Sequence, residues 1–596
     1  MLGEPHIREV TADRTVDDAS GAPVAGGRGP RGTRRLAVLR AALTAPPGSV
    51  WRDPVTWAIA VAVFAAYFVI SLFRLLQLAP GSYDFGIYTE YVKQLSQLHA
   101  PVVDILGPGF NLLGNHFQPA VGVIAPFFRL FPSPATLLFF QALSAAVSVF
   151  PVVTVGFAFT ERSTGRLIGL AYGFSWGLQQ MIDFDFHEIA LAVPLLAFAV
   201  AALVRRRQVA AIAWAVPLVF VKEDQGFTVA AIGVLLGASA AFPRLLPPPS
   251  GSVRRVLARR RWPAWLGGRL LRDRGPWGEG YVALWGGLFL VAWGLFWSTF
   301  AITMIIPHFN PLHEYYFWSD GGTVGGGKKF SAGALLGQAG GGWPTKAPTI
   351  VMLLLPTAFA ALGSPVTLLA LPSLALRFVS TNSMFWGTAY HYNATVMPIL
   401  FIAAADGIRR WRRASEPSWP APGSGPLTGS RPVPRPAAGS GPVQGSGPIL
   451  RRLRPPGRVR NVARAARSGV ARHGGAMMAA IAVALAFQFP LSNLWQASTY
   501  RLDAHVAAAN AAMAVVPDGA TVQTTLDLLA PLAARTDTFW IGTPGNPVTQ
   551  YIVFDGADSG YSPPVTNVPK FIKNFYSRDG YVPVFQRDDV YVYRRS

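Results

Sequence analysis

The sequence contains no cysteine, which excludes disulfide bonds, cysteine-ligated zinc and thiol nucleophiles. It is also poor in charge: Asp, Glu, Lys and Arg make up only 14% of its 596 residues, against about 25% in a typical soluble domain. Hydrophobic residues make up 51% of the chain and the mean hydropathy is +0.32. These values exclude a single water-soluble globule and indicate an integral membrane protein.

Acidic residues are scarcer than basic ones, 30 against 52, so the formal net charge is +22. Such an excess is typical of nucleic-acid binding, or of a membrane protein whose arginines lie in cytoplasmic segments. The arginines cluster in the N-terminal tail, in the short turn 205–207, and in the long loops 242–280 and 409–474. All of these segments fall on one side of the membrane if the N-terminus is cytoplasmic. The positive-inside rule therefore accounts for the charge, and we expect no nucleic-acid partner.

Apolar runs recur along the chain and predict a polytopic α-helical membrane protein with about eleven transmembrane helices, since about 20 residues cross a bilayer core. Several runs are shorter and meet at Gly or Pro, which suggests broken or tilted helices that line a cavity. The apolar stretch 118–132 contains Arg129 and three prolines, and we interpret it as interfacial or re-entrant. The runs lie at 57–79, 134–158, 165–182, 189–204, 208–222, 225–241, 281–305, 347–363, 365–379, 394–408 and 475–492.

Polar segments divide the chain further. Residues 1–56 predict a disordered cytoplasmic tail, and 411–474 predict a basic Pro/Gly-rich cytoplasmic linker between the membrane core, 57–410, and the last transmembrane helix, 475–493. In 494–596, strand-like runs such as TFWIG, YIVFDG and DDVYVYRR accompany helix-like runs such as LDLLAPLAAR and VPKFIKNFY, which predicts a small α/β domain. The same topology predicts a multi-pass plasma-membrane protein with a cytoplasmic N-terminus and an extracytoplasmic C-terminal domain.

Acidic and histidine residues gather in the turns on the side opposite the arginines. Ionisable groups at a membrane boundary are costly unless paired or hydrated, so their concentration on one face predicts a functional cleft. Outer loops also need polar residues for solvation, which is the alternative for any single member. The set is Asp84, Glu90, His116, Asp183, Asp185, His187, Glu188, Glu223, Asp224, His308, His313, Glu314 and His391. The predicted substrate-binding residues are Tyr83, His116, Gln118, Asp185, His187, Lys222, Glu223, Asp224 and His391.

Asp84 is the candidate catalytic base. It follows the first span by a few residues and stands between Tyr83 and Phe85, close to the surface where an amphiphilic substrate presents its head group. A carboxylate in such a partly dry site can have a raised pKa and accept a proton. The alternative is that Asp84 only caps the helix that begins there.

Two other turns offer ligand chemistry. The turn IDFDFHE places Asp183, Asp185 and His187 two residues apart, a set that can hold a divalent cation such as Mg²⁺ or Mn²⁺, or orient a sugar or phosphate. Lys222, followed by Glu223 and Asp224, can hold a phosphate or simply neutralise the two acids. No cofactor is established by these patterns.

A series of motifs resembles a known family. YDFGIYTEYV, NLLGNHFQP, PSPATLLFFQAL, DFDFHEIALAVPLLAFA and KEDQG, in this order, are similar to the bacterial membrane proteins grouped as domain of unknown function 2079. The resemblance covers roughly 57–410, and the C-terminal VPDGATVQTTLDLLAPLAAR and YIVFD are similar to the family's tail domain. That family is grouped by similarity with the GT-C membrane glycosyltransferases.

The resemblance implies a GT-C-like enzyme that takes a sugar from a polyprenyl-phosphate donor at the outer face of the membrane, with an envelope glycan or protein as acceptor. It implies that Asp84 is the base and that Asp185, His187, Glu223 and Asp224 surround the donor phosphate or a metal. The chain departs from the GT-C pattern in having a single Asp, without an adjacent acidic pair, in its first outer loop. A transporter or lipid flippase is one alternative, although its spans would need ionisable residues near their centres. A non-catalytic envelope scaffold or sensor is another.

Overall fold

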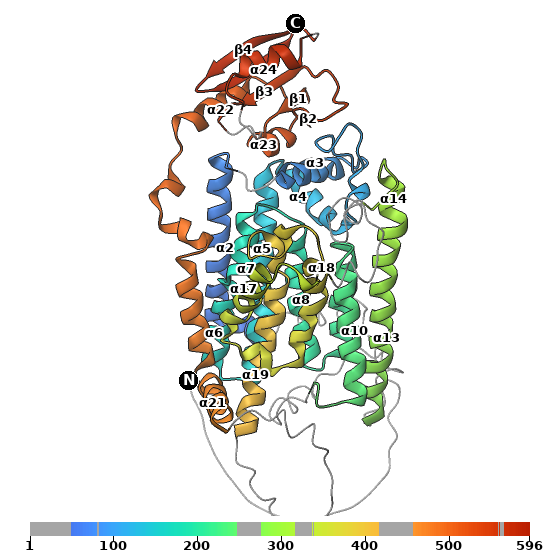
Figure 1. Ribbon diagram of the computed structural model, residues 1–596, viewed down its shortest axis with the longest axis vertical. Helices are drawn as coiled ribbons and strands as arrows, with labels where there is room; N and C mark the ends of the chain where they lie inside the picture. Colours follow the sequence, from blue (N-terminus) through green and yellow to red (C-terminus); the bar gives the residue numbers. More distant parts are fainter. Residues whose placement is uncertain are drawn as a thin grey trace, which may run out of the picture. The chain divides into compact units, whose positions relative to one another are not determined.

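The structure is a computed structural model, which describes residues 49–79, 83–246, 276–315, 337, 339–415, 457–557, 560, 565–577 and 579–596. The described chain is mostly helical, and its C-terminal part forms one five-stranded sheet (Figure 1). Most of the tail predicted over 1–56 and the linker residues 416–456 lie outside the described residues. A short 3-10 helix, η1 (Val50–Arg52), precedes the first long helix.

Four described helices are long and apolar enough to cross a membrane. They are α2 (Pro54–Leu76), α5 (Pro134–Phe159), the helix Gly280–Phe309, and Asn461–Ala486 within α21 (Gly457–Ala486). The third combines α13 (Pro276–Phe300), the π-helical turn η5 (Ala301–Ile305) and α14 (Ile306–Phe309). Pro54 is the first residue of α2, and Asp53 caps the helix: its side chain accepts a hydrogen bond from the Thr56 backbone N–H at 3.0 Å.

Shorter helices fill the space between these four. The first group is α6 (Arg162–Gly173), α7 (Trp176–Asp183), α8 (Ile189–Val204), α9 (Gln208–Ala215), η4 (Val216–Phe220) and α10 (Gln225–Ala241). The second group is α17 (Trp343–Leu354), η6 (Leu355–Thr357), η7 (Ala360–Gly363), η8 (Pro365–Ala370), α18 (Leu371–Phe378) and α19 (Val396–Ser415). The predicted stretch 118–132 forms η3 (Pro119–Ile124) and α4 (Ala125–Leu130), both short.

The prediction of about eleven helices needs correction where apolar runs are interrupted. The runs 189–204 and 225–241 coincide with α8 and α10. The run 165–182, in contrast, is split into α6 and α7. The run 347–363 is broken by Ala358 and Phe359, whose φ angles of 48° and 59° reverse the helical path. The interrupted runs therefore form short, broken helices.

The helices α10 and α13 pack side by side through facing glycines (Figure 1). A Cβ added at Gly294 would lie 2.2 Å from the Gly226 carbonyl oxygen, so a side chain there would force the helices apart. Small residues allow helix backbones to approach closely in a membrane. This contact fixes the first turn of α10, which follows directly on Lys222, Glu223 and Asp224.

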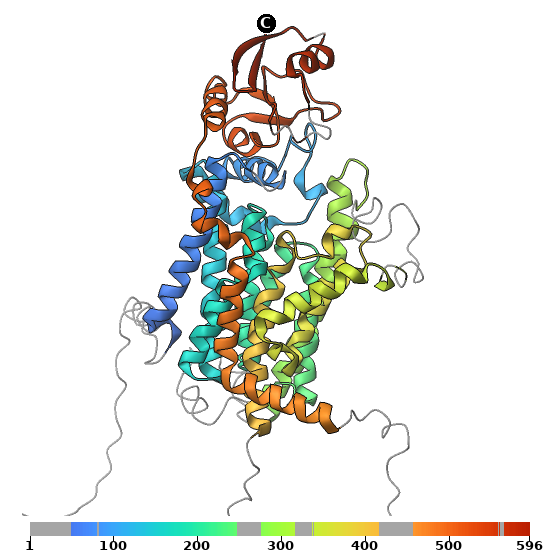
Figure 2. The same cartoon turned by 60° about the vertical axis from the view of Figure 1, so that its left-hand side comes forward.

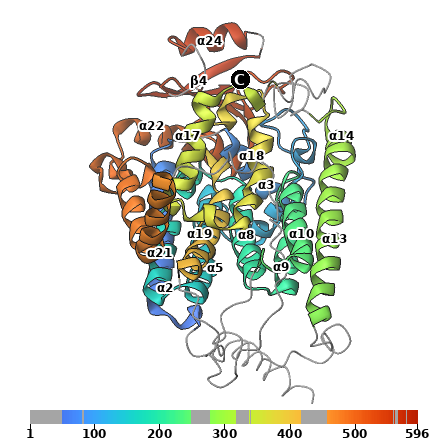
Figure 3. The same cartoon turned by 60° about the horizontal axis from the view of Figure 1, so that its bottom comes forward.

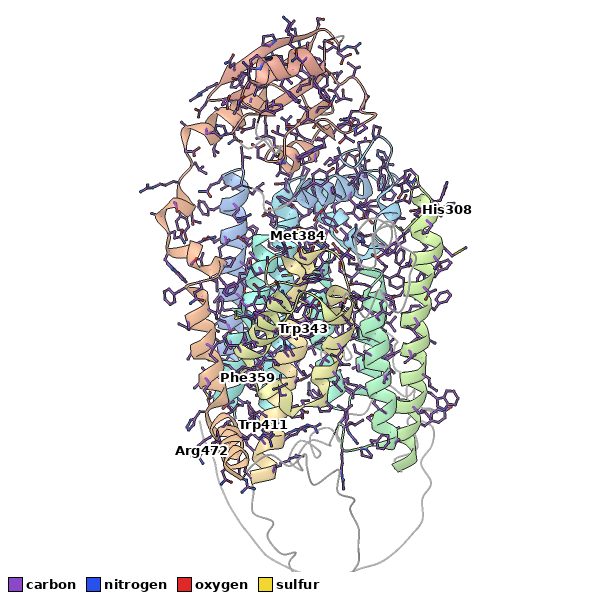
Figure 4. All side chains as sticks on the ribbon, viewed as in Figure 1. His308, Trp343, Phe359, Met384, Trp411 and Arg472 are labelled. Carbon is purple, nitrogen blue, oxygen red and sulfur yellow. The ribbon has the colours of Figure 1, made fainter. Side chains whose placement is uncertain are left out.

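The arginine-rich segments meet at one end of the bundle. Arg412 Nη1 lies 2.6 Å from Glu161 Oε1 and Arg412 Nε donates to the Ala471 carbonyl at 2.6 Å, while Arg410 Nη1 donates to the Arg244 carbonyl at 3.2 Å. Figure 3, which brings this end forward, shows α19 and α21 near α5. In Figure 4, Trp411 and Arg472 mark this end and Met384 lies toward the other. The described parts of these arginine-rich segments therefore lie together at one end of the bundle.

The C-terminal segment folds into a mixed sheet of order β2-β1-β3-β5-β4. The strands β1 (Thr521–Thr524), β2 (Asp537–Trp540) and β3 (Tyr551–Asp555) are parallel, whereas β5 (Val590–Arg595) is antiparallel to β3 and to β4 (Tyr581–Arg587). The helix α22 (Ala504–Ala514) packs in one hydrophobic core with β3 and β5, and α24 (Val568–Phe575) packs in a second. The predicted α/β domain is thus confirmed as a mixed sheet with helices.

This domain packs directly on α3 (Asp84–Ser96), the helix that begins at the candidate base. Leu529 in α23 (Leu529–Ala533) shares a hydrophobic core with Phe85, and a Cβ added at Gly86 would lie 2.9 Å from the Leu529 Cβ. Lys93 Nζ donates to the Thr536 carbonyl at 2.6 Å and lies 3.7 Å from an Asp537 carboxylate oxygen. The C-terminal domain therefore fixes the position of α3.

Lys93→Met should weaken this contact. The Lys93 side chain is only 8% exposed, and its removal leaves the Thr536 carbonyl without its donor, at a cost of about 1–3 kcal/mol. We expect a lower unfolding temperature and faster trypsin cleavage between α21 and the sheet. The exposed Lys573→Met in the same domain is the control and should change stability by less than about 0.5 kcal/mol. Equal behaviour of the two variants would contradict a docking role for Lys93.

Candidate functional site

Polar side chains from five chain segments meet near α3, the helix on which the C-terminal domain packs. Figure 2 shows the C-terminal domain above this end of the helices. The segments are the first turns of α3, the loop before η3, the turn before α8, the turn before α10, and η10 (His391–Asn393). We call their side chains the polar network: Asp84, Tyr88, His116, Gln118, His187, Glu188, Lys222, Glu223 and His391. The structure thus brings together most of the residues that the sequence predicts for the site.

Glu188 is the centre of the polar network. Its carboxylate is fully buried and lies 2.8 Å from Lys222 Nζ. The Tyr88 hydroxyl donates to its Oε2 and also lies 2.9 Å from Gln118 Oε1, while His187 Nδ1 contacts the same Oε2. A buried carboxylate is stable only when such partners satisfy it. Glu188 therefore fixes three side chains from three segments.

His187 lies between two carboxylates. Its Nδ1 faces Glu188, and its Nε2 lies 3.9 Å from Asp84 Oδ2. The ring stacks on His391, with 3.6 Å between centroids and 19° between planes. In the described part of the chain, the buried His391 Nδ1 has no hydrogen-bond partner. The Asp84 side chain is 37% exposed and that of His187 only 7%, so Asp84 is the accessible end of this series.

A second group forms around Glu223. His116 Nδ1 lies 2.7 Å from Glu223 Oε1, and the Tyr315 hydroxyl donates to the same oxygen at 3.0 Å. The Phe117 backbone N–H donates to Glu223 Oε2 at 3.1 Å. Asp224 accepts a hydrogen bond from the Gln225 side chain at 3.1 Å. This group fixes the loop before η3 onto the turn before α10.

The predicted metal ligands do not meet. Arg74 in α2 lies 3.2 Å from Asp183 Oδ1 and 3.5 Å from Asp185 Oδ1, whereas His187 faces Glu188. Asp185 has a positive φ, 63°, and after this turn of the chain the His187 side chain points away from the two aspartates. Among the described residues, no group of three or more His, Asp or Glu side chains is placed to hold a metal ion.

The predicted residues Tyr83 and His308 also lie outside the network. The Tyr83 hydroxyl donates to the Ile105 carbonyl at 2.7 Å, and its ring packs edge-on against Trp540 with 4.9 Å between centroids. Burial, with the nearby charges of Asp84 and Glu90, raises the pKa of Tyr83 above its usual value. Tyr83 is therefore a contact of the C-terminal domain. His308, in α14, lies at the edge of the molecule (Figure 4).

Sequence reasoning missed three contributors. Tyr88 follows Asp84 by four residues on α3, so helical spacing alone places the two on one face. Arg74 lies inside the first apolar run, and a single charge in such a run could have indicated that it pairs with an acidic residue. Tyr315 follows α14, and nothing in its local sequence indicates that it reaches Glu223.

Burial raises the pKa of Glu90, on α3, to about 8, against a usual value of 4.5. Its Oε2 accepts a hydrogen bond from the Ile105 backbone N–H at 3.2 Å, and its Oε1 has no partner among the described residues. A carboxyl group whose pKa is higher in the folded state binds its proton more tightly there. Stability contributed by protonated Glu90 is therefore present below pH 4.5 and is lost as the pH rises toward about 8.

Glu90→Gln should remove this pH dependence. We expect the free energy of unfolding of the wild type in detergent to fall between pH 5 and pH 9 by at most about 4–5 kcal/mol more than that of the variant, which is followed as a larger fall in unfolding temperature. Glu161→Gln is the control, because the hydrogen bond from Arg412 lowers the pKa of Glu161 and moves its titration below this range. Parallel pH profiles for Glu90→Gln and the wild type would contradict the assignment.

Comparisons with known proteins agree with a membrane protein. No curated protein matches the chain. Six chains of solved structures match it. One is the crystal structure of ArnT from Cupriavidus metallidurans bound to undecaprenyl phosphate, with 13% sequence identity and a TM-score of 0.44, over 89% of this chain and 97% of that chain. The model of a family described as predicted membrane protein, DUF2079, matches residues 74–422, a range that includes the whole polar network. Because this match covers more than half of the sequence, the chain belongs to the DUF2079 family of predicted membrane proteins.

Proposed function

We propose that the chain is an integral membrane glycosyltransferase of GT-C type, which uses a polyprenyl-phosphate-linked sugar at the outer face of the plasma membrane. The observation that carries the proposal is the series Asp84, His187, Glu188, in which one imidazole lies between an accessible and a fully buried carboxylate. General bases are commonly built in this way, with the reacting group oriented by a second, buried group.

In the proposed reaction, Asp84 accepts the proton of an acceptor hydroxyl. The acceptor oxygen forms a bond to the anomeric carbon, and the bond from that carbon to the phosphate oxygen breaks, so the electron pair leaves with the lipid phosphate. Glu188 holds Nδ1 of His187, which leaves Nε2 directed toward Asp84. The imidazole then lies beside Asp84, 3.9 Å from Oδ2, and orients it, while the proton stays on Asp84.

The departing phosphate needs positive charge nearby. Lys222 is the permanent cation of the polar network, 2.8 Å from Glu188. Two imidazole rings lie near it, His116 beside Glu223 and His187 beside Glu188. We therefore assign phosphate stabilisation to Lys222 with these two imidazoles.

The location of the polar network also supports lipid-linked chemistry. It lies at the ends of helices, in turns beside the apolar spans, where the phosphate of a membrane lipid would be held. A transporter would need ionisable groups along the centre of its spans, and the network is confined to one end. The C-terminal domain, packed on α3, is the proposed contact for an envelope glycan or protein acceptor.

The test is turnover by the wild-type protein in lipid nanodiscs. Polyprenyl-phosphate donors that carry different labelled hexoses and pentoses are supplied with an envelope extract as acceptor, and release of polyprenyl phosphate is measured. We expect turnover with at least one donor. The absence of turnover with every donor would contradict the proposal. In a parallel arm with sealed liposomes, movement of labelled donor between leaflets without transfer would indicate a flippase instead.

A further inference from the structure

A cavity of about 330 Å³ lies between the end of α2 and the segment that leads to the C-terminal domain. On one side it is lined by Ile70, Arg74, Gln77 and Ala79. On the other it is lined by Asn493 in η11 (Pro490–Trp495), by Ser498 and Thr499 in η12 (Ala497–Tyr500), and by Gln496 between them. Figure 2 shows this segment beside the upper end of α2. None of the lining residues belongs to the polar network.

The two walls are held together by specific contacts. Gln77 Nε2 donates to the Ser498 carbonyl at 2.8 Å and to the Arg501 carbonyl at 2.9 Å. The Phe73 and Tyr500 rings pack edge-on with 4.9 Å between centroids, and the Tyr500 hydroxyl donates to the Leu494 carbonyl at 2.6 Å. These contacts give the cavity a defined shape.

The charge of the cavity is already balanced. Arg74 is the only charged side chain among the described residues that line it, and its guanidinium pairs with Asp183 and Asp185. An anionic ligand would have to compete with these two carboxylates. A neutral ligand would meet no such opposition.

The lining groups fit hydroxyl groups. The side-chain oxygen of Gln77, the side-chain amides of Asn493 and Gln496 and the hydroxyls of Ser498 and Thr499 supply acceptors and donors in a small area, whereas the Gln77 nitrogen is used in the wall contacts. The volume is at the lower end of the range for small-molecule sites, about 300–1,000 Å³, which suits one or two sugar rings. We propose that this cavity binds a neutral saccharide unit, presented either by a glycolipid or by a soluble glycan.

Arg74 connects this cavity to the polar network. It holds Asp185, which precedes His187 by two residues, so the wall of the cavity and the turn that carries His187 share one ion-paired group. If glycosyl transfer is the activity, the bound saccharide is part of the acceptor. Only this assignment rests on the proposed function, because saccharide binding requires no turnover.

The experiment measures binding by the whole protein, separately from turnover. In one arm, an array of neutral mono- to tetrasaccharides is probed with tagged protein in detergent. In the other, native mass spectrometry counts monoglucosyl diacylglycerol bound to protein from doped nanodiscs. The double variant Asn493→Ala, Gln496→Ala should bind at least tenfold more weakly in the arm where the wild type binds. Gln488→Ala, at an exposed glutamine near the end of α21, is the control and should bind as the wild type does.

The outcomes separate the two hypotheses. Binding only in the first arm identifies a soluble glycan, and binding only in the second identifies a glycolipid. Failure of the wild type to bind in both arms, or unchanged binding by a folded double variant, would overturn the inference. Asp84→Asn should still bind the saccharide, because Asp84 does not line the cavity. If the wild type binds the saccharide but turns over no donor, glycosyl transfer is rejected and the cavity assignment stands.

Discussion

Asp84→Asn should reduce glycosyl transfer by about 10²–10⁴-fold, the usual contribution of a positioned general base. Asparagine has nearly the same shape as aspartate but cannot accept the proton of an acceptor hydroxyl. The Asp84 side chain is 37% exposed and lies at the accessible end of the network, 3.9 Å from His187 Nε2. Its loss should therefore change the unfolding temperature little while it removes the chemistry.

Turnover of Asp84→Asn is compared with that of Asp104→Asn. Asp104 lies in the loop after α3 and accepts a hydrogen bond from the Gly109 backbone N–H at 2.7 Å, which an asparagine oxygen can still accept. This control should retain turnover within about twofold. Asp84→Glu, which restores a carboxylate with a longer side chain, should recover part of the activity. An Asp84→Asn variant with the turnover of the control would remove Asp84 from the mechanism.

The fold could be predicted from the sequence where an apolar run is uninterrupted. The run 225–241 is the helix α10, and YIVFD is the strand β3. The length of the apolar run 347–363 could not show that its helix ends at Ala358 and Phe359. An apolar run has the same hydrophobicity whether it forms one long helix or two short ones. Likewise, the strand β4 was not predicted, because its pairing with β5 joins residues that have no shared local pattern.

The site shows the same division. Charge and topology were sufficient to place His187, Lys222 and His391 at one end, because polar residues outside the apolar spans collect there. Partner choice was not predictable from that pattern. Asp183 and Asp185 resembled metal ligands by spacing, but they pair with Arg74, from a helix more than 100 residues earlier in the chain. Contacts between distant segments depend on the packing of whole helices, which a local motif does not contain.

Replacing Glu188 should cause the largest loss of stability. Glu188→Met removes the carboxylate that Lys222, Tyr88 and His187 share. It leaves the Lys222 ammonium, whose side chain is only 16% exposed, without the carboxylate oxygen that lies 2.8 Å away. An unpaired charge in such surroundings costs about 3–5 kcal/mol. The expected result is a large drop in unfolding temperature in detergent, together with loss of turnover.

A double-mutant cycle separates this charge effect from a simple loss of packing. Lys222→Met should also destabilise the protein, because it leaves the buried Glu188 carboxylate uncompensated. The double variant Glu188→Met, Lys222→Met buries neither charge and should be destabilised by clearly less than the sum of the two single variants. Glu161→Met is the matched control, because Glu161 is 62% exposed and its ion pair with Arg412 should contribute less than about 1 kcal/mol. Additive effects of Glu188→Met and Lys222→Met would show that the two residues are not coupled. Glu188 could then not be regarded as the centre of the polar network.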